Sequence, residues 1–119
     1  MSELIQLEKR GHIAVLTIAN PPANTWTADS LAALKATVED LNADRNIFAL
    51  VVTGQGEKFF SAGADLKTFA DGDRARANDM AQRFGEAFAA LTAFRGVSIA
   101  AVNGYAMGGG LECAMACDI

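Results

Sequence analysis

The stretch AAVNGYAMGGGLE, residues 100–112, decides how the rest of the chain is organised. Its apolar start predicts a buried strand, the glycines end that strand, and the pattern then favours a helix with Glu112 in its first turn. N–H groups at a helix start are unpaired and lie at the positive end of the helix dipole, so they favour a bound negative charge. Glycines let a ligand approach that backbone closely. The stretch therefore predicts an oxyanion hole with an acid/base beside it.

The segments that precede this stretch predict an α/β fold. Apolar runs at 47–52 and 97–102 predict strands buried on both faces, and runs at 4–7 and 13–18 predict two strands joined at 10–12. Three helices are predicted: one from Thr27 or Asp29, one from about Asp73 to Phe94, and one from Gly109 or Gly110 to Cys117. The order ββαβαβα favours parallel strands with right-handed crossovers.

The first two helices each have an apolar stripe at helical spacing, which we interpret as core packing. In the first helix the stripe consists of Leu31, Leu34, Val38 and Leu41, and in the second of Met80, Phe84, Ala87, Phe88 and Leu91.

A second glycine-bearing segment, SAGAD at 61–65, ends a long stretch from residue 53 that predicts no regular structure. An irregular connection of this length in a compact domain is usually functional, and the alternative is a plain surface turn. Like the glycine cluster, it follows the carboxyl end of a predicted strand, where α/β sheets bind ligands. Two N–H donors from two such loops are the minimum for an oxyanion hole.

Several other interpretations of these residues have to be weighed. One interpretation of Glu112 is a solvated carboxylate in the first turn of the helix. Its apolar neighbours in the sequence favour burial near the sheet instead. His12 is expected in a solvated turn, and Cys113 and Cys117 are expected as small core residues. The glycines match neither a dinucleotide fingerprint nor a phosphate-binding P-loop, no serine lies in a hydrolase elbow, and no metal-ligand pattern is present.

Composition bounds the remaining function classes. The 119 residues correspond to one domain at most, with 51% apolar residues and a net charge of −4. A mildly acidic chain without a basic tract disfavours nucleic acid as a partner. The N-terminus lacks the pattern of a signal peptide, and no apolar run could span a bilayer, so we expect a cytoplasmic protein with no membrane partner.

Three stretches together resemble the enoyl-CoA hydratase/isomerase (crotonase) family: FFSAGADL at 59–66, AVNGYAMGGGLE at 101–112, and PPAN at 21–24. The resemblance implies a crotonase-like (ClpP/crotonase) α/β spiral of ββα units, with residues 1–119 forming the N-terminal portion of a single domain about twice as long. A half-built spiral leaves sheet edges uncovered, so we expect the isolated segment to be unstable as a monomer. The resemblance implies a homotrimer or a hexamer built as a dimer of trimers.

The resemblance also implies roles for individual residues. The oxyanion donors would be the backbone N–H groups of Ala64 and Gly109, and Glu112 would be the first of the two glutamates that hydratases of this family use. Contacts to coenzyme A or substrate would come from Pro22, Ala23, Ala62, Asp65, Leu66, Lys67 and Gly108. The resemblance implies no metal and no cofactor other than the coenzyme A of the substrate.

The function that the resemblance implies is hydration of trans-2-enoyl-CoA thioesters in the degradation of fatty acids or related acyl groups. Two alternatives are kept. One is a double-bond isomerase of the same fold, in which position 112 need not be acidic. The other is a non-catalytic CoA-binding fragment, because the second glutamate would lie beyond residue 119.

Overall fold

The computed structural model describes residues 3–65 and 71–119 and shows a ββα unit three times in succession. The elements are β1 (Ile5–Arg10), β2 (Ile13–Ile18) and α1 (Ala28–Ala43); β3 (Ala49–Gly54), β4 (Phe59–Ser61) and α2 (Arg74–Thr92); and β5 (Val97–Ala101), β6 (Tyr105–Ala106) and α3 (Gly109–Ala116). The α/β class, the three predicted helices and the repeated ββα unit are therefore confirmed.

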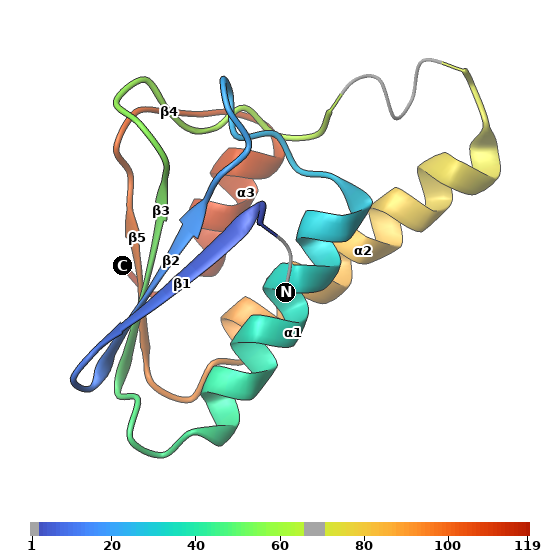
Figure 1. Cartoon of the computed structure of the whole chain (residues 1–119). Coiled ribbons are helices and arrows are strands. Elements are labelled where there is room, and N and C mark those ends of the chain that lie inside the picture. The colour runs from blue at the N-terminus through green and yellow to red at the C-terminus, as the bar shows by residue number, and fades with distance from the viewer. Residues whose placement is uncertain (1–2, 66–70) are drawn as a thin grey trace.

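The main sheet has the strand order β1-β2-β3-β5. β1 pairs antiparallel with β2, whereas β2, β3 and β5 run parallel, with Val15 beside Val51 and Val51 beside Ile99. Parallel strands end at the same edge of the sheet, and β4 crosses above this edge in Figure 1. The segments that follow β3 and β5 are thus brought together at one end of the molecule, as the sequence predicts.

β4 and β6 are absent from the sequence-based prediction, which leaves 53–65 without regular structure. They form a second, parallel two-stranded sheet. The Tyr105 N–H donates to Lys58 O at 2.9 Å, and the Met107 N–H donates to Ser61 O at 3.0 Å. This prediction is wrong because partners far apart in sequence, rather than any local apolar pattern, make these short strands.

α1 and α2 lie side by side and cover one face of the main sheet (Figure 1). As predicted, all four residues of the α1 stripe are buried. The α2 stripe is buried as well, except for Phe84, which is half-buried. Burying each such large apolar side chain stabilises the fold by roughly 1.5–3 kcal/mol.

Burial alternates along β3, where Leu50 and Val52 are buried and Ala49 and Val51 are half-buried. The prediction that the strands near 47–52 and 97–102 are buried on both faces is therefore wrong. The reason is that the described helices cover only one face of this sheet (Figure 1).

Candidate active site

The start of α3 differs from that of an ordinary helix because no side chain of the described residues caps it. Its N-cap residue, Gly108, has φ +53° and ψ −122°, a conformation that favours glycine. A glycine has no side chain that could accept a hydrogen bond from the first turn. The Gly110 N–H donates to Met107 O and the Glu112 N–H to Gly108 O. The Gly109 N–H has no hydrogen-bond partner within 3–65 and 71–119, so it is open to a ligand.

A second open N–H belongs to Ala64, in the loop that follows β4. Trp26 holds the loop on both sides of it: the Trp26 N–H donates to Gly63 O at 2.8 Å, and Trp26 O accepts from the Asp65 N–H at 3.2 Å. The Ala64 N–H, which lies between these two bonds, has no partner in the described part of the chain. The loop is therefore fixed while its central donor stays free.

The loop and the helix start lie against each other. A Cβ at Gly110 would meet Ser61 O at 2.0 Å, and a Cβ at Gly63 would meet Gly109 N at 3.0 Å. Only a residue without a side chain permits an approach this close. The two open donors, Ala64 and Gly109, consequently lie on segments in direct contact.

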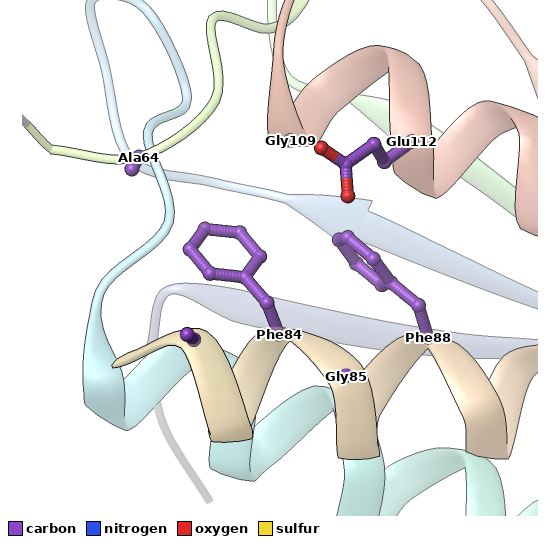
Figure 2. Close-up of a pocket in the computed structure, with 7 residues that line it drawn as sticks. Ala64, Phe84, Gly85, Phe88, Gly109 and Glu112 are labelled. Atoms are coloured by element: carbon purple, nitrogen blue, oxygen red, sulfur yellow. The ribbon is translucent and has the colours of Figure 1, made fainter. Parts of the chain in front are cut away.

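These donors and Glu112 line one cavity of about 480 Å³, within the range of about 300–1,000 Å³ that ligand pockets occupy. Figure 2 shows the Glu112 carboxylate projecting from α3 toward the space above the rings of Phe84 and Phe88, which rise from α2. The arrangement offers two hydrogen-bond donors for an oxygen that gains negative charge, and a carboxylate that can exchange protons with a bound molecule.

Glu112 corrects one expectation from the sequence, because its side chain is exposed rather than buried near the sheet. The apolar neighbours that suggested burial include Leu111 and Met115, which are themselves 48% and 75% exposed. Among the described residues, no segment covers this side of α3. The apolar run therefore indicates an uncovered face of the helix, not a buried one.

Four cavity residues from α2 were not recognised as site residues in the sequence: Ala81, Phe84, Gly85 and Phe88. Sequence periodicity places Phe84 and Phe88 in the core stripe, and Phe88, only 9% exposed, does pack edge-on against Trp26 and Phe84. The same rings form the apolar wall of the cavity. Helical spacing cannot tell an aromatic side chain that faces the core from one at the border between core and ligand.

Two asparagines that were not predicted as site residues, Asn24 and Asn103, position the loop. Asn103 accepts from the Gly54 N–H at 3.0 Å through Oδ1 and donates through Nδ2 to Gly56 O at 2.9 Å and to Phe59 O at 3.0 Å. The fully buried Asn24 also donates to Phe59 O, at 3.0 Å. Together they anchor the connection from β3 to β4, and hence the loop that carries Ala64.

The residues expected to contact coenzyme A are only partly brought together. The Ala62 N–H donates to Ala23 O at 2.9 Å, which joins the PPAN turn to the second loop. Pro22 is exposed in that turn, Asp65 follows Ala64, and Gly108 precedes the open donor of α3. Leu66 and Lys67 lie outside the described residues. The binding roles of all these residues stay predictions.

The remaining candidate residues lie away from the cavity wall. Cys113 is fully buried and burial raises the pKa of its thiol; the pKa of Cys117 is raised to about 11, mainly by burial. His12 is exposed, and its Nδ1 lies 2.7 Å from Asn46 O.

The described residues contain no group of three or more histidine, cysteine or acidic side chains that could hold a metal ion. None of the described helices has the length and apolar content that crossing a membrane requires.

Comparison with known proteins identifies the relatives of this chain. Residues 8–119 match the model of the enoyl-CoA hydratase/isomerase family. The chain is 38% identical to a short-chain-enoyl-CoA hydratase of Clostridium acetobutylicum, over 95% of this chain and 44% of that protein. It is 41% identical to a carnitinyl-CoA dehydratase of Salmonella arizonae, over 99% of this chain and 45% of that protein.

Solved structures agree with the sequence matches. The structure of Pseudomonas aeruginosa DspI superposes with a TM-score of 0.97 and is 69% identical, over 99% of this chain and 48% of that one. An enoyl-CoA hydratase from Bacillus anthracis superposes with a TM-score of 0.94 at 28% identity, over 98% of this chain and 46% of that one. The chain thus spans less than half the length of each of these relatives.

Proposed function

Because the chain belongs to the enoyl-CoA hydratase/isomerase family, we propose that the protein that carries it adds water to trans-2-enoyl-CoA thioesters. One observation carries the proposal: two open N–H donors, of Ala64 and Gly109, border the same cavity as the Glu112 carboxylate. Enolate formation from a thioester develops charge on a single oxygen, and two convergent donors suit that chemistry. Two relatives are named as a hydratase and a dehydratase of CoA thioesters, which supports the proposal.

In this proposal the thioester carbonyl oxygen accepts hydrogen bonds from the Ala64 and Gly109 N–H groups. Glu112 takes a proton from water as the water oxygen bonds to Cβ of the substrate. The electrons of the Cα=Cβ bond then move toward the carbonyl, which becomes the enolate oxygen. A proton delivered to Cα completes the 3-hydroxyacyl-CoA; the family resemblance implies a second glutamate for this transfer, beyond residue 119.

Coenzyme A would act as a handle in the reaction. Binding energy from a remote, unreactive part of a substrate can hold the reacting atoms in place. We assign this role to the PPAN turn, to Ala62, Asp65 and Gly108, and to Leu66 and Lys67, which lie outside the described residues. The proposed substrates place the protein in the degradation of fatty or related acyl groups.

We also propose that the whole protein assembles as a trimer or as a dimer of trimers. The exposed apolar side chains of Leu111 and Met115 on α3 support a surface that another subunit covers. Light scattering of the purified protein tests the assembly, and a monomeric mass at micromolar concentration would contradict it.

The direct test of function is Glu112→Gln, which keeps the size of the side chain and removes its charge and basicity. Loss of a positioned acid/base should lower kcat for hydration by about 10²–10⁴-fold. The dissociation constant for a saturated acyl-CoA should change little, because coenzyme A contacts other residues. Glu57→Gln, at an exposed site outside the cavity, is the matched control. Unchanged hydration by the Glu112 variant would remove the proposed role.

An isomerase of the same fold is the alternative function, and the carboxylate at position 112 disfavours it because isomerases need no acid there. The two functions separate on a 3-enoyl-CoA substrate. A hydratase leaves that substrate largely unchanged, whereas an isomerase converts it to the conjugated 2-enoyl-CoA. Conversion faster than hydration of the 2-enoyl-CoA would replace the proposed function with the isomerase.

A further inference from the structure

Within residues 3–65 and 71–119, Gly85 is the one glycine whose φ is not positive and whose added Cβ would meet no other atom. Of the eleven glycines, five have a positive φ and five others would place a Cβ under 3.0 Å from another atom. The first group is Gly11, Gly56, Gly63, Gly72 and Gly108, and the second is Gly54, Gly96, Gly104, Gly109 and Gly110. At Gly85 the φ is not positive, and an added Cβ would meet no atom within 4 Å.

The position is nevertheless unfavourable for a glycine. Gly85 lies in the interior of the 19-residue helix α2, well away from both caps. Apart from proline, glycine is the poorest helix former, because it loses the most backbone freedom on folding. Alanine would fit here without strain or collision. A residue that weakens its own helix without any packing reason points to a functional cause.

The cavity supplies such a cause. Gly85 lines it between the rings of Phe84 and Phe88, with Ala81 one helical turn earlier (Figure 2). The wall contributed by α2 thus combines two aromatic rings with two positions of little or no side chain. The edge-on contact of the rings, with centroids 5.7 Å apart, restrains them. Space at this wall is therefore set by the small positions and not by movement of the rings.

The position of the two open donors, Gly109 and Ala64, indicates which part of a substrate would lie in the space beside Gly85. Phe84 reaches the start of α3, since its ring carbon Cε1 would lie 2.7 Å from a Cβ at Gly109. A thioester carbonyl held at Gly109 and Ala64 would therefore have the α2 wall beside it. The residues that α2 contributes to this wall have no polar side chain, which suits a hydrocarbon chain.

We propose that Gly85 is a specificity-determining residue, which leaves room for long apolar acyl chains to extend along α2 past Phe84 and Phe88. This inference rests on the proposed function and names its substrate class: enoyl-CoA thioesters whose acyl chain reaches beyond the two rings. Glycine stands at this position although a residue with a higher helix propensity would stabilise α2.

The test compares Gly85→Ala and Gly85→Leu with Ala89→Leu in the whole protein. Ala89 is exposed one turn further along α2 and does not line the cavity. The substrates run from crotonyl-CoA to trans-2-dodecenoyl-CoA. Gly85→Leu should lower the ratio of kcat/KM for the longest to the shortest substrate by about 10-fold or more, because even one methylene in an apolar pocket has effects of 10–200-fold. The ratio should be unchanged in Ala89→Leu.

Gly85→Ala gives a second, independent measurement. It should raise the melting temperature by about 2–4 °C while it lowers the same ratio to a smaller extent. A melting temperature that falls would show that the fold does require this glycine, and would overturn the inference. A ratio that stays constant in a folded Gly85→Leu protein would overturn it as well.

Failure of the proposed function has a different signature. If the unaltered protein hydrates none of these substrates, the reaction is wrong, and the inference is then tested by calorimetry with butyryl-CoA and dodecanoyl-CoA. Gly85→Leu should selectively weaken binding of dodecanoyl-CoA, by about 10-fold. Equal effects on both ligands would overturn the role of Gly85.

Discussion

The starts of α1 and α2 are closed by the chain itself, whereas the start of α3 is open. Thr27 and Ser30 form a reciprocal capping box at α1, with hydrogen bonds of 3.0 and 2.9 Å between side chains and backbone N–H groups. The Asp73 carboxylate accepts from two N–H groups in the first turn of α2. At α3 a glycine replaces the capping side chain.

The start of a helix therefore contributes to stability in α1 and α2, whereas in α3 it is left open for a ligand. A side-chain cap stabilises a helix by about 1 kcal/mol because it satisfies donors that would otherwise face water. α3 forgoes this stabilisation at Gly108, and its first residue, Gly109, lines a cavity that is also lined by the carboxylate residue Glu112. An open helix start beside a second open N–H is the arrangement that the proposed binding of an oxygen that gains charge requires.

The largest effect is expected when Gly109→Pro removes the donor at the open start of α3. Proline is accommodated at the first helical position but has no N–H. Loss of one oxyanion donor should lower kcat by about 10²–10³-fold, or about 2.7–4 kcal/mol of barrier. Steady-state hydration kinetics measure the effect.

Gly109→Ala is the control for this variant, because it also adds a Cβ next to the Phe84 ring but keeps the N–H. The difference between the two variants isolates the donor from the displacement of the ring. Equal rates for folded Gly109→Pro and Gly109→Ala would show that the Gly109 N–H contributes nothing to the reaction.

The open donors require support from outside their own segments, and Asn103→Ala tests that support. The variant leaves the Gly54 N–H and the Gly56 carbonyl oxygen of the β3–β4 connection without their side-chain partner, whereas Phe59 O keeps its bond from Asn24. Unsatisfied groups of this kind cost about 1–3 kcal/mol, which urea unfolding of the whole protein measures. Asn78→Ala, at an exposed site of α2 with no such bonds, should not destabilise the protein. Equal stability of both variants would contradict the anchoring role.

The smallest effect is expected at the closed start of α2. Asp73→Ala removes the cap and should lower the free energy of unfolding by about 1 kcal/mol. Because Asp73 lies outside the cavity, kcat should change by less than about twofold. A rate loss comparable to that of Gly109→Pro would mean that the two kinds of helix start are not functionally distinct.

The helices were predictable because their signals are local. Thr27 before a stripe at 3.6-residue spacing predicts both the start of α1 and its buried face, and the structure confirms them. The glycine cluster likewise predicts a start of α3 at Gly109 or Gly110, and the helix starts at Gly109, after a residue whose conformation favours glycine. In each case the information lies within a few residues.

Features that depend on distant partners were not predictable. β4 exists through pairing with β6, more than forty residues later, and the single-sided burial of the main sheet depends on where helices pack. Phe84 was assigned to the core because spacing along a helix says nothing about a neighbouring cavity. Gly85 does carry a local signal, a glycine inside a helical pattern, but this signal gains meaning only once the structure shows that an added Cβ would meet none of the described residues.

Amide NMR of the whole protein tests whether the Ala64 and Gly109 N–H groups bind the carbonyl oxygen of a CoA thioester. We predict that addition of a saturated acyl-CoA shifts both amide proton resonances strongly downfield, as hydrogen bonding to a new acceptor requires. The amides at the capped start of α2, Ala75 and Arg76, should stay in place because Asp73 already accepts from them. Binding of the acyl-CoA with both the Ala64 and Gly109 resonances unmoved would contradict the account.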